Sequence, residues 1–308
     1  MKCRKCSQNA VINMRQHKLA LCKEHFLEWV VGQTERFIHK YKMFSPSDNL
    51  LVSVSGGKDS LSLWDILIRL GYEADGLYIG LGIEEGLNYS SQSEQHCKKF
   101  ASEHNLNLIV VDISEQSGES IPQIALRSNR AKDKPCSVCG LIKRHVMNRI
   151  ACDGHYDVLL TGHNLDDEAA VLFGNTLYWK TGYLTRQWPV LQANHPGVIR
   201  KAKPLCRFYE KEMAAYAFLR GIEYIYEECP FSSGAKSIYY KGFLNKLEAN
   251  QPGTKLQFYL SFLQAKAGGL FAENADPDLE AIHACSSCGS PTTAPGDCAF
   301  CRLVKTDR

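Results

Sequence analysis

Short apolar runs alternate with longer helix-patterned segments through the middle of this 308-residue chain, and this alternation constrains its fold most. LLVSV at 50–54 and DVLLTG at 157–162 have the length and composition of buried strands. We predict strands at 50–54, 75–81, 107–113, 157–162 and 222–226, and helices at 59–70, 90–105, 137–152, 165–180 and 208–220. This spacing is typical of βαβ units. It predicts an α/β fold with a doubly wound, mostly parallel sheet.

Helical patterning also flanks this alternating region. Apolar residues recur at helical spacing over 24–43 and again over 236–267, where Gln251-Pro252-Gly253 makes a break. We expect five units along the chain: a zinc finger at 1–27, a connecting helix at 28–48, a catalytic domain at 49–232, a helical segment at 233–280 and a zinc ribbon at 281–308. AENADPD at 272–278 is the expected linker to the last unit.

Composition limits the class of protein. No apolar run approaches the ~18–20 residues that span a bilayer, and MKCRKCSQNA has no apolar signal core. We therefore expect a cytoplasmic protein, in which thirteen cysteines indicate metal binding or catalysis rather than disulfides. The formal charge of +3 falls to near zero if zinc binds at both ends, so a nucleic-acid partner must be argued from local patches.

Both ends of the chain carry four soft metal ligands in two close pairs. The N-terminal set is Cys3, Cys6, Cys22 and His25. The C-terminal set is Cys285, Cys288, Cys298 and Cys301. Two such pairs suit tetrahedral Zn²⁺, and four protein ligands leave no open position for a substrate. We predict two structural zinc sites.

A glycine-containing loop, SGGKDS at 55–60, lies where the first predicted strand ends and a helix begins. Its glycines let backbone N–H groups turn inward, and the helix N-terminus and Lys58 add positive charge for a phosphate. Asp59 either caps the helix or helps to hold Mg²⁺. The spacing differs from the Walker and dinucleotide patterns. Residues expected at the nucleotide are Ser53, Ser55, Gly56, Gly57, Lys58, Asp59 and Ser60, with Gly162 and His163 from a second motif.

That second motif, GHNLDDE at 162–168, follows the predicted strand at 157–162. Adjacent carboxylates at a helix start often serve as caps. If Asp166 and Asp167 face the phosphate loop, they could instead hold Mg²⁺ or accept a proton from the substrate.

The two motifs together resemble a known family. SGGKDS is similar to the loop of N-type ATP pyrophosphatases, which split ATP into AMP and pyrophosphate to adenylate a substrate. The chain resembles the TtcA/TtuA tRNA 2-thiolation family in the lysine of this loop and in the GHN-x-DD motif. The paired terminal zinc sites resemble those of the TtuA-like subgroup, and the resemblance covers essentially the whole chain. The resemblance implies ATP and Mg²⁺ as cofactors, a tRNA uridine in the T-loop or at the wobble position as substrate, and a homodimer. It also implies sulfide or a ubiquitin-like thiocarboxylate carrier as sulfur donor.

One further pair, Cys136-x-x-Cys139 in DKPCSVCGLIKR, has no partner pair nearby. A redox pair at a helix start is one interpretation. A third zinc site, completed by His145 and Cys152, is another. The third is an iron–sulfur cluster completed by one remote cysteine.

The third ligand of such a cluster has two candidates. Cys229 precedes a proline, as cluster ligands often do, and Cys206 is the alternative. The family resemblance implies that Cys136, Cys139 and Cys229 bind a [4Fe–4S] cluster whose open iron could hold and deliver sulfur.

Basic residues surround this pair and indicate an RNA partner. The first group is Arg127, Arg130, Lys132, Lys134, Lys143, Arg144 and Arg149, and the second is Arg200, Lys201, Lys203 and Arg207. Phosphate contacts of this kind position an RNA without reading its sequence. Lys143 lies one helical turn after Cys139 and resembles the family's catalytic lysine. The expected catalytic set is Lys143, Asp166, Asp167 and Asp59.

We therefore predict a tRNA 2-thiouridine synthetase. The uridine C2 oxygen attacks the α-phosphate of ATP, pyrophosphate leaves, and sulfur then displaces AMP at C2. One alternative is a cluster-free adenylating enzyme, such as an amidotransferase or a lysidine synthase. Another is a non-enzymatic, zinc-stapled RNA-binding protein.

Overall fold

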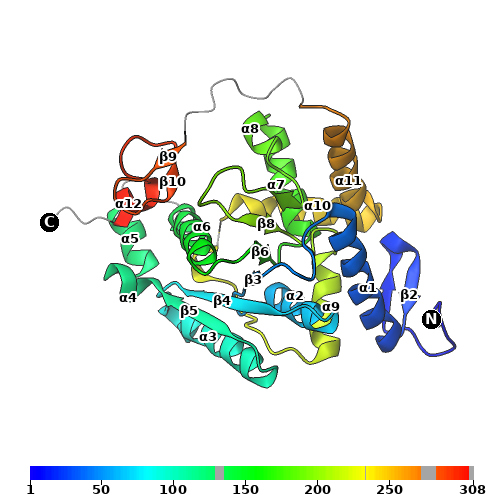
Figure 1. Ribbon diagram of the computed structural model, residues 1–308. Helices are drawn as coiled ribbons and strands as arrows, with labels where there is room; N and C mark the ends of the chain where they lie inside the picture. Colours follow the sequence, from blue (N-terminus) through cyan, green and yellow to red (C-terminus); the bar gives the residue numbers. More distant parts are fainter. Residues whose placement is uncertain (129–134, 233, 272–281, 305–308) are drawn as a thin grey trace.

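The computed structural model of the protein describes residues 1–128, 135–232, 234–271 and 282–304 (Figure 1). The predictions for Arg130, Lys132, Lys134 and the linker at 272–278 lie outside these ranges. The central sheet consists of β3 (Leu50–Ser53), β4 (Ala74–Gly80), β5 (Leu108–Asp112), β6 (Val158–Thr161), β7 (Val190–Leu191) and β8 (Arg200–Ala202). Their order is β5-β4-β3-β6-β8-β7, and every neighbouring pair is parallel except β7 with β8. The predicted α/β fold is confirmed.

Helices cover both faces of this sheet. The α-helices of the described chain are α1 (Lys23–Tyr41), α2 (Lys58–Arg69), α3 (Glu85–Glu103), α4 (Ile113–Ser117), α5 (Ile121–Arg127), α6 (Pro135–Asp153), α7 (Leu165–Leu177), α8 (Thr181–Leu184), α9 (Glu210–Arg220), α10 (Lys236–Asn250), α11 (Thr254–Ala267) and α12 (Ala299–Val304). Of these, α8 and α10 pack on α7, and α12 packs on α6. Among the described residues, no helix has both the length and the apolar character needed to cross a bilayer.

Successive residues of the central strands supply two separate cores. Leu50 and Val52 point into a core shared with α1, α2, α7, α9 and α11, whereas Leu51 points into a second core shared with α5 and α6. Side chains of a strand alternate between the two faces of its sheet, and a parallel sheet covered on both faces therefore reads as a continuous apolar run. This is why LLVSV could be recognised as a strand.

The prediction of a strand at 222–226 is wrong. This segment has no strand pairing; its Ile225 N–H donates to the carbonyl of Gly56 at 2.9 Å, so it crosses the phosphate loop at the carboxyl ends of the strands. β3 already pairs with β4 on one side and β6 on the other and has no free edge for it. The strands that do extend the sheet, β8 and β7, have three and two residues and lack a detectable pattern.

The two chain ends form small subdomains on opposite sides of the molecule (Figure 1). The hairpin of β1 (Ile12–Met14) and β2 (Leu19–Leu21) buries Met14 and Leu21 in the core under α1. At the other end, β9 (His283–Ala284) pairs with β10 (Pro291–Thr292). α12 packs there on α6, where the ring of Phe300 stacks on His145 with centroids 3.9 Å apart.

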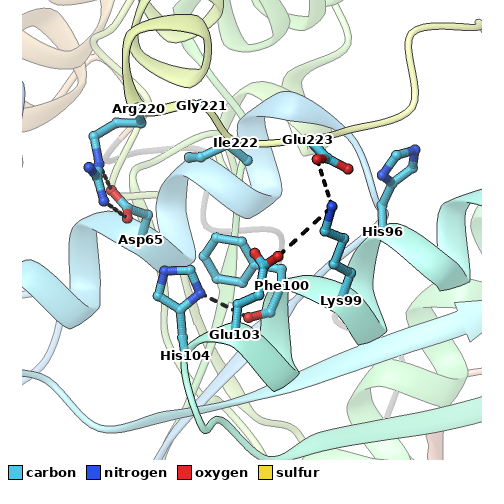
Figure 2. Close-up of a pocket in the computed structure, with 10 residues that line it drawn as sticks. All are labelled: Asp65, His96, Lys99, Phe100, Glu103, His104, Arg220, Gly221, Ile222 and Glu223. Atoms are coloured by element: carbon cyan, nitrogen blue, oxygen red, sulfur yellow. Dashed lines mark hydrogen bonds and ion pairs between the residues drawn. The ribbon is translucent and has the colours of Figure 1, made fainter.

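A buried carboxylate joins α2 to α9 beside a cavity of about 120 Å³ (Figure 2). Asp65 accepts hydrogen bonds from Tyr216 Oη at 2.5 Å, from Arg220 at 2.8 and 3.0 Å, and from Arg69 at 3.0 Å. Burial alone would raise the pKa of Asp65, but Arg220 and Tyr216 hold it below its usual value. Because its partners all belong to α2 and α9, we interpret Asp65 as a structural residue.

Candidate active site

The SGGKDS loop joins β3 to α2 and adopts the turn expected for an anion cradle. Gly56 has φ of 73°, and a Cβ there would lie 2.5 Å from the carbonyl oxygen of Ser93. Ser60 Oγ accepts the Ser55 N–H at 3.0 Å and holds the loop closed. The N-cap of α2 is Gly57, which has no side-chain cap among the described contacts, so Asp59 is not the cap. The helix N-terminus is therefore open to a ligand anion.

The GHNLDDE motif lies directly against this loop. A Cβ at Gly162 would stand 2.8 Å from the Ser60 nitrogen, so only glycine allows β6 to approach α2 this closely. The buried Asn164 caps α7 through the N–H groups of Asp166 and Asp167 and donates to Asp59 at 3.2 Å. The structure thus brings both predicted motifs together at the carboxyl edge of the sheet, where ligands bind in such folds.

Two lysines and three carboxylates form a charged network at this edge. Lys58 contacts Asp59 at 3.1 Å and Glu210 at 2.8 Å, and Lys241 contacts Asp167 at 2.7 Å and Glu210 at 3.5 Å. Burial raises the pKa of Asp59, and nearby Asp167 adds to this. Burial would also raise the pKa of Asp167, but Lys241 outweighs it and lowers that pKa. The two carboxyl groups therefore have pKa values shifted in opposite directions.

Sequence reasoning missed Glu210 and Lys241. Glu210 begins α9 and Lys241 lies on α10, far from either motif, and neither has a recognisable local pattern. Only the packing of α10 along α7 brings Lys241 to the site.

Asp166 lies in a different environment from Asp167. It is 4% exposed, and its two oxygens accept from Lys255 Nζ at 2.5 Å and from the Glu210 N–H at 2.9 Å. Lys255 is itself only 2% exposed. Both oxygens of Asp166 are thus used to join α7, α9 and α11.

A narrow cavity of about 50 Å³ opens beside the phosphate loop. Ser53, Ser55, Tyr89 and Lys143 are among the residues that line it. Burial raises the pKa of Tyr89, and its proximity to Cys229 raises it further. The cavity therefore lies between the phosphate loop and the cysteines of α6.

The three cysteines predicted for a cluster lie in one neighbourhood. Cys136 and Cys139 occupy the first turn of α6, and the Cys136 thiol donates to the carbonyl of Phe231, two residues after Cys229, at 3.1 Å. Burial raises the pKa of the Cys139 thiol, Lys143 opposes this, and Cys229 and Cys136 add to it. Lys143 is thus placed between the thiols and the cavity.

Cys206, the alternative third ligand, lies elsewhere. It is fully buried in the core beneath α1 and α11, and burial raises its pKa to about 12. Cys139 and Cys229 border the other core, on the opposite face of the sheet. The third-zinc interpretation also lacks support in the described residues, because the His145 ring stacks on Phe300.

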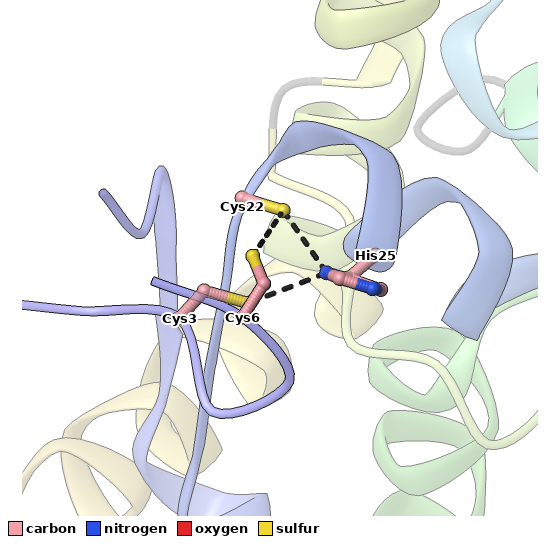
Figure 3. A group of neighbouring side chains, drawn as sticks. All are labelled: Cys3, Cys6, Cys22 and His25. Atoms are coloured by element: carbon pink, nitrogen blue, oxygen red, sulfur yellow. Dashed lines mark hydrogen bonds between the residues drawn. The ribbon is translucent and has the colours of Figure 1, made fainter. Parts of the chain in front are cut away.

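Both sets of terminal ligands converge. In the N-terminal set, His25 Nδ1 lies 3.2 Å from Cys22 Sγ and 3.5 Å from Cys3 Sγ (Figure 3). The ligand atoms of each set lie within 4.8 Å of one another, as a shared tetrahedral ion requires. All four residues of the C-terminal set, Cys285, Cys288, Cys298 and Cys301, belong to such a group.

Several residues of the predicted basic groups make contacts within the protein. Arg200 pairs with Asp48 at 2.6 Å, and Lys203 pairs with Glu168 at 2.7 Å. The guanidinium of Arg207 covers the ring of Phe37. The second basic group therefore contributes to the fold and does not form one free surface.

A phosphate loop after the first strand of a parallel sheet, facing an Asn-x-Asp-Asp helix start, defines a PP-loop ATP pyrophosphatase. Residues 28–234 match the PP-loop domain family, and residues 2–27 match the N-terminal LIM domain of 2-thiouridine synthetase TtuA.

Known proteins of similar sequence agree. The chain is 47% identical to the tRNA-5-methyluridine(54) 2-sulfurtransferase of Thermus thermophilus, over 98% of this chain and 91% of the relative. It is 44% identical to the Thermotoga maritima protein of the same name, over 99% of this chain and 96% of the relative. The chain belongs to this family of TtuA-type tRNA 2-sulfurtransferases, as the resemblance implied.

A solved structure shares the fold. The structure of the "U34-tRNA thiolase NcsA from Methanococcus maripaludis with its [4Fe-4S] cluster" superimposes with a TM-score of 0.79. It is 23% identical and covers 98% of this chain and 95% of that one.

Proposed function

We propose that this protein replaces the C2 oxygen of uridine 54 in the tRNA T-loop by sulfur, at the expense of ATP. The observation that carries the proposal is the position of Lys143, which lines one small cavity together with the phosphate loop and lies beside the cysteines Cys139 and Cys229. The relatives at 44–47% identity are named for position 54, whereas the wobble-position enzyme is only 23% identical. Position 54 is therefore favoured over position 34.

ATP binds with its phosphates at the open N-terminus of α2. Lys58, now paired with Asp59 and Glu210, turns toward the phosphates, and Asp59 and Asp167 are placed to hold Mg²⁺. Because its pKa is lowered, Asp167 is ionised at neutral pH and suits a metal ligand better than a proton acceptor. Asp166 is a positioning residue that fixes α7.

The uridine C2 oxygen attacks the α-phosphorus, and pyrophosphate leaves with the electrons of the broken P–O bond. Sulfur then attacks C2, and AMP departs with the former C2 oxygen. Lys143 borders both the cavity and Cys139, so its ammonium can stabilise negative charge that develops on the uracil or the phosphate.

Cys136, Cys139 and Cys229 would hold a [4Fe–4S] cluster, a group that the NcsA structure contains by its description. Their donor set fits: three thiols share one neighbourhood, and such a cluster takes cysteine thiolates as ligands. With three protein ligands, such a cluster would supply an iron without a protein ligand, at which sulfur could bind. The terminal ligand sets would each hold one structural Zn²⁺. The units proposed around them are the zinc finger at 1–27 and the zinc ribbon at 281–308.

We also propose a homodimer in the cytoplasm that receives sulfur as sulfide or from a ubiquitin-like thiocarboxylate carrier. These points rest on the family resemblance. The cytoplasm is proposed because the tRNA substrate is found there.

The test is thiolation in vitro. Iron-reconstituted protein is incubated without oxygen with ATP, Mg²⁺, sulfide and tRNA that carries 5-methyluridine at position 54, and the tRNA fragments are analysed by mass spectrometry. We expect oxygen-to-sulfur exchange in the T-loop fragment and no exchange in tRNA with cytidine at position 54. One AMP should be released for each sulfur atom incorporated. Exchange in the anticodon fragment instead, or none in either, would refute the proposal.

A further inference from the structure

Four large aromatic side chains project into solvent where α7 ends and α10 begins. Tyr178 is 58% exposed, Trp179 68%, Tyr183 67% and Tyr239 73%. α8 follows α7 directly, and α10 packs along α7, so the four belong to adjoining elements (Figure 1). With Lys180 and Lys236 they form what we call the aromatic–lysine face.

The two lysines lie over the tyrosine rings. Lys180 Nζ is 5.4 Å from the ring centroid of Tyr178 and 5.7 Å from that of Tyr183, and Lys236 Nζ is 5.4 Å from the ring of Tyr178. Cation–π contacts of this kind fix the ammonium groups beside the rings and leave N–H donors available. Positive charge and flat aromatic surface are thus held together.

Acidic residues are missing from the segments that build this face. The sequence has no aspartate or glutamate over 169–209 or over 229–247, although the whole chain has 33. Those two segments contain nine lysines and arginines in all. Two cations of the first segment, Arg200 and Lys203, form ion pairs within the fold. Lys180 and Lys236, in contrast, are exposed.

Trp179 is held in an unusual backbone conformation. Its φ is 48°, in the left-handed region that bulky residues seldom adopt. This left-handed residue ends α7 in a capping turn, in which the Trp179 N–H donates to the carbonyl of Thr176 at 3.1 Å and the Lys180 N–H to that of Asn175 at 2.9 Å. The turn holds the indole in solvent, where its faces are accessible to a stacking ligand.

A second copy of this chain is a poor occupant for the face. In a two-fold symmetric contact the same patch meets itself, so lysines would face lysines with no carboxylate to neutralise them. A polyanion with flat, stackable groups complements both features, and single-stranded or looped RNA provides phosphates and bases together.

We propose that the aromatic–lysine face binds tRNA, with an unpaired base stacked on Trp179 or Tyr239 and phosphates at Lys180 and Lys236. The inference rests on the proposed function and adds where the tRNA is held. α7 leads from Asp167 at the phosphate loop to Leu177 beside the face, about 15 Å along the helix. Lys241, which contacts Asp167, also lies five residues after Lys236 on α10. RNA bound on this face can therefore extend into the active site.

The test is equilibrium binding of unmodified tRNA to the full-length, metal-loaded protein, measured by fluorescence anisotropy at several salt concentrations. Trp179→Ala should weaken binding about 5- to 100-fold, and Trp179→Phe much less, because a phenyl ring still stacks. Phe218→Ala is the matched control: Phe218 is 78% exposed on α9, outside the face, and its loss should leave the affinity unchanged. Lys180→Ala with Lys236→Ala should reduce the slope of log K against log salt by about 1–2.

ATP affinity, sedimentation velocity and thiolation by the wild type are measured on the same proteins. If the wild type thiolates tRNA but Trp179→Ala and Tyr239→Ala bind tRNA as tightly as it does, this inference fails and the proposed function stands. If Trp179→Ala instead changes the oligomeric state, the face is a contact between copies and the inference is overturned. If the wild type neither binds nor thiolates tRNA, both proposals fail.

Discussion

Lys255 Nζ on α11 lies 2.5 Å from Asp166 Oδ1 on α7, and both side chains are almost completely buried. This contact separates the roles of two adjacent carboxylates that look equivalent in the sequence. Asp166 is directed into the packing of α7 against α11, whereas Asp167 remains with Lys241 at the edge of the phosphate loop.

Lys255→Met should destabilise the protein by about 3–5 kcal/mol, because it leaves the Asp166 carboxylate buried without its cation. Urea unfolding of the metal-loaded protein at pH 7 measures this. Lys246→Met, at an exposed position of α10, is the control and should change the free energy of unfolding by less than about 0.5 kcal/mol. Equal stability of the two variants would show that the pair contributes little.

Lys241→Met should move the acidic limb of the pH–rate profile to higher pH. Lys241 lowers the pKa of Asp167, so its removal raises that pKa, and the ionised form needed for Mg²⁺ appears only at higher pH. The measurement is tRNA-dependent pyrophosphate release from pH 8 down to about pH 3.5, because the pKa of Asp167 in the wild type lies below the ordinary carboxyl value of about 3.9, with Lys246→Met as control. An acidic limb that stays in place would mean that Asp167 does not have this role.

Gly56→Ala should weaken ATP binding at least about tenfold, because the new Cβ meets the Ser93 carbonyl and the residue must keep a left-handed φ. Gly242→Ala provides the comparison: it lies within α10 with open space around it, and there alanine should leave ATP affinity unchanged and stabilise the helix slightly. Calorimetric titration with ATP compares the two. Normal affinity in Gly56→Ala would contradict the proposed phosphate cradle.

Asp65→Asn should lower the free energy of unfolding by about 3 kcal/mol at neutral pH, since Arg220 loses its buried counter-ion. The pKa of Asp65 is lowered in the folded state, so its contribution is present above its unfolded pKa and is lost as pH falls through the folded value. The difference between wild type and Asp65→Asn should therefore shrink on acidification. A difference that stays constant with pH would rule out this linkage.

The sequence identified the parts of the protein that have local signatures. The central strands are apolar runs, and the loop at 55–60 and the motif at 162–168 have glycines where backbones approach each other. Ligand pairs such as Cys285 and Cys288 are close in sequence and therefore visible as metal sites.

The parts that were missed depend on contacts between distant segments. β8 and β7 are strands because they extend the sheet beyond β6, whereas segment 222–226 crosses the phosphate loop and pairs with no strand. Likewise, Lys241 and Lys255 reach the site only through the packing of α10 and α11 on α7. A single sequence has no local signal for such pairs.

Cys136, Cys139 and Cys229 are proposed to hold an iron–sulfur cluster that tRNA thiolation needs. The most direct measurement is the iron content and thiolation activity of Cys229→Ala beside Cys206→Ala, both purified without oxygen. Wild type and Cys206→Ala should be brown, contain about four irons per chain and thiolate tRNA. Cys229→Ala should lose the colour and the activity but still bind ATP. Full iron content in Cys229→Ala, or an active wild type without iron, would rule out this cluster.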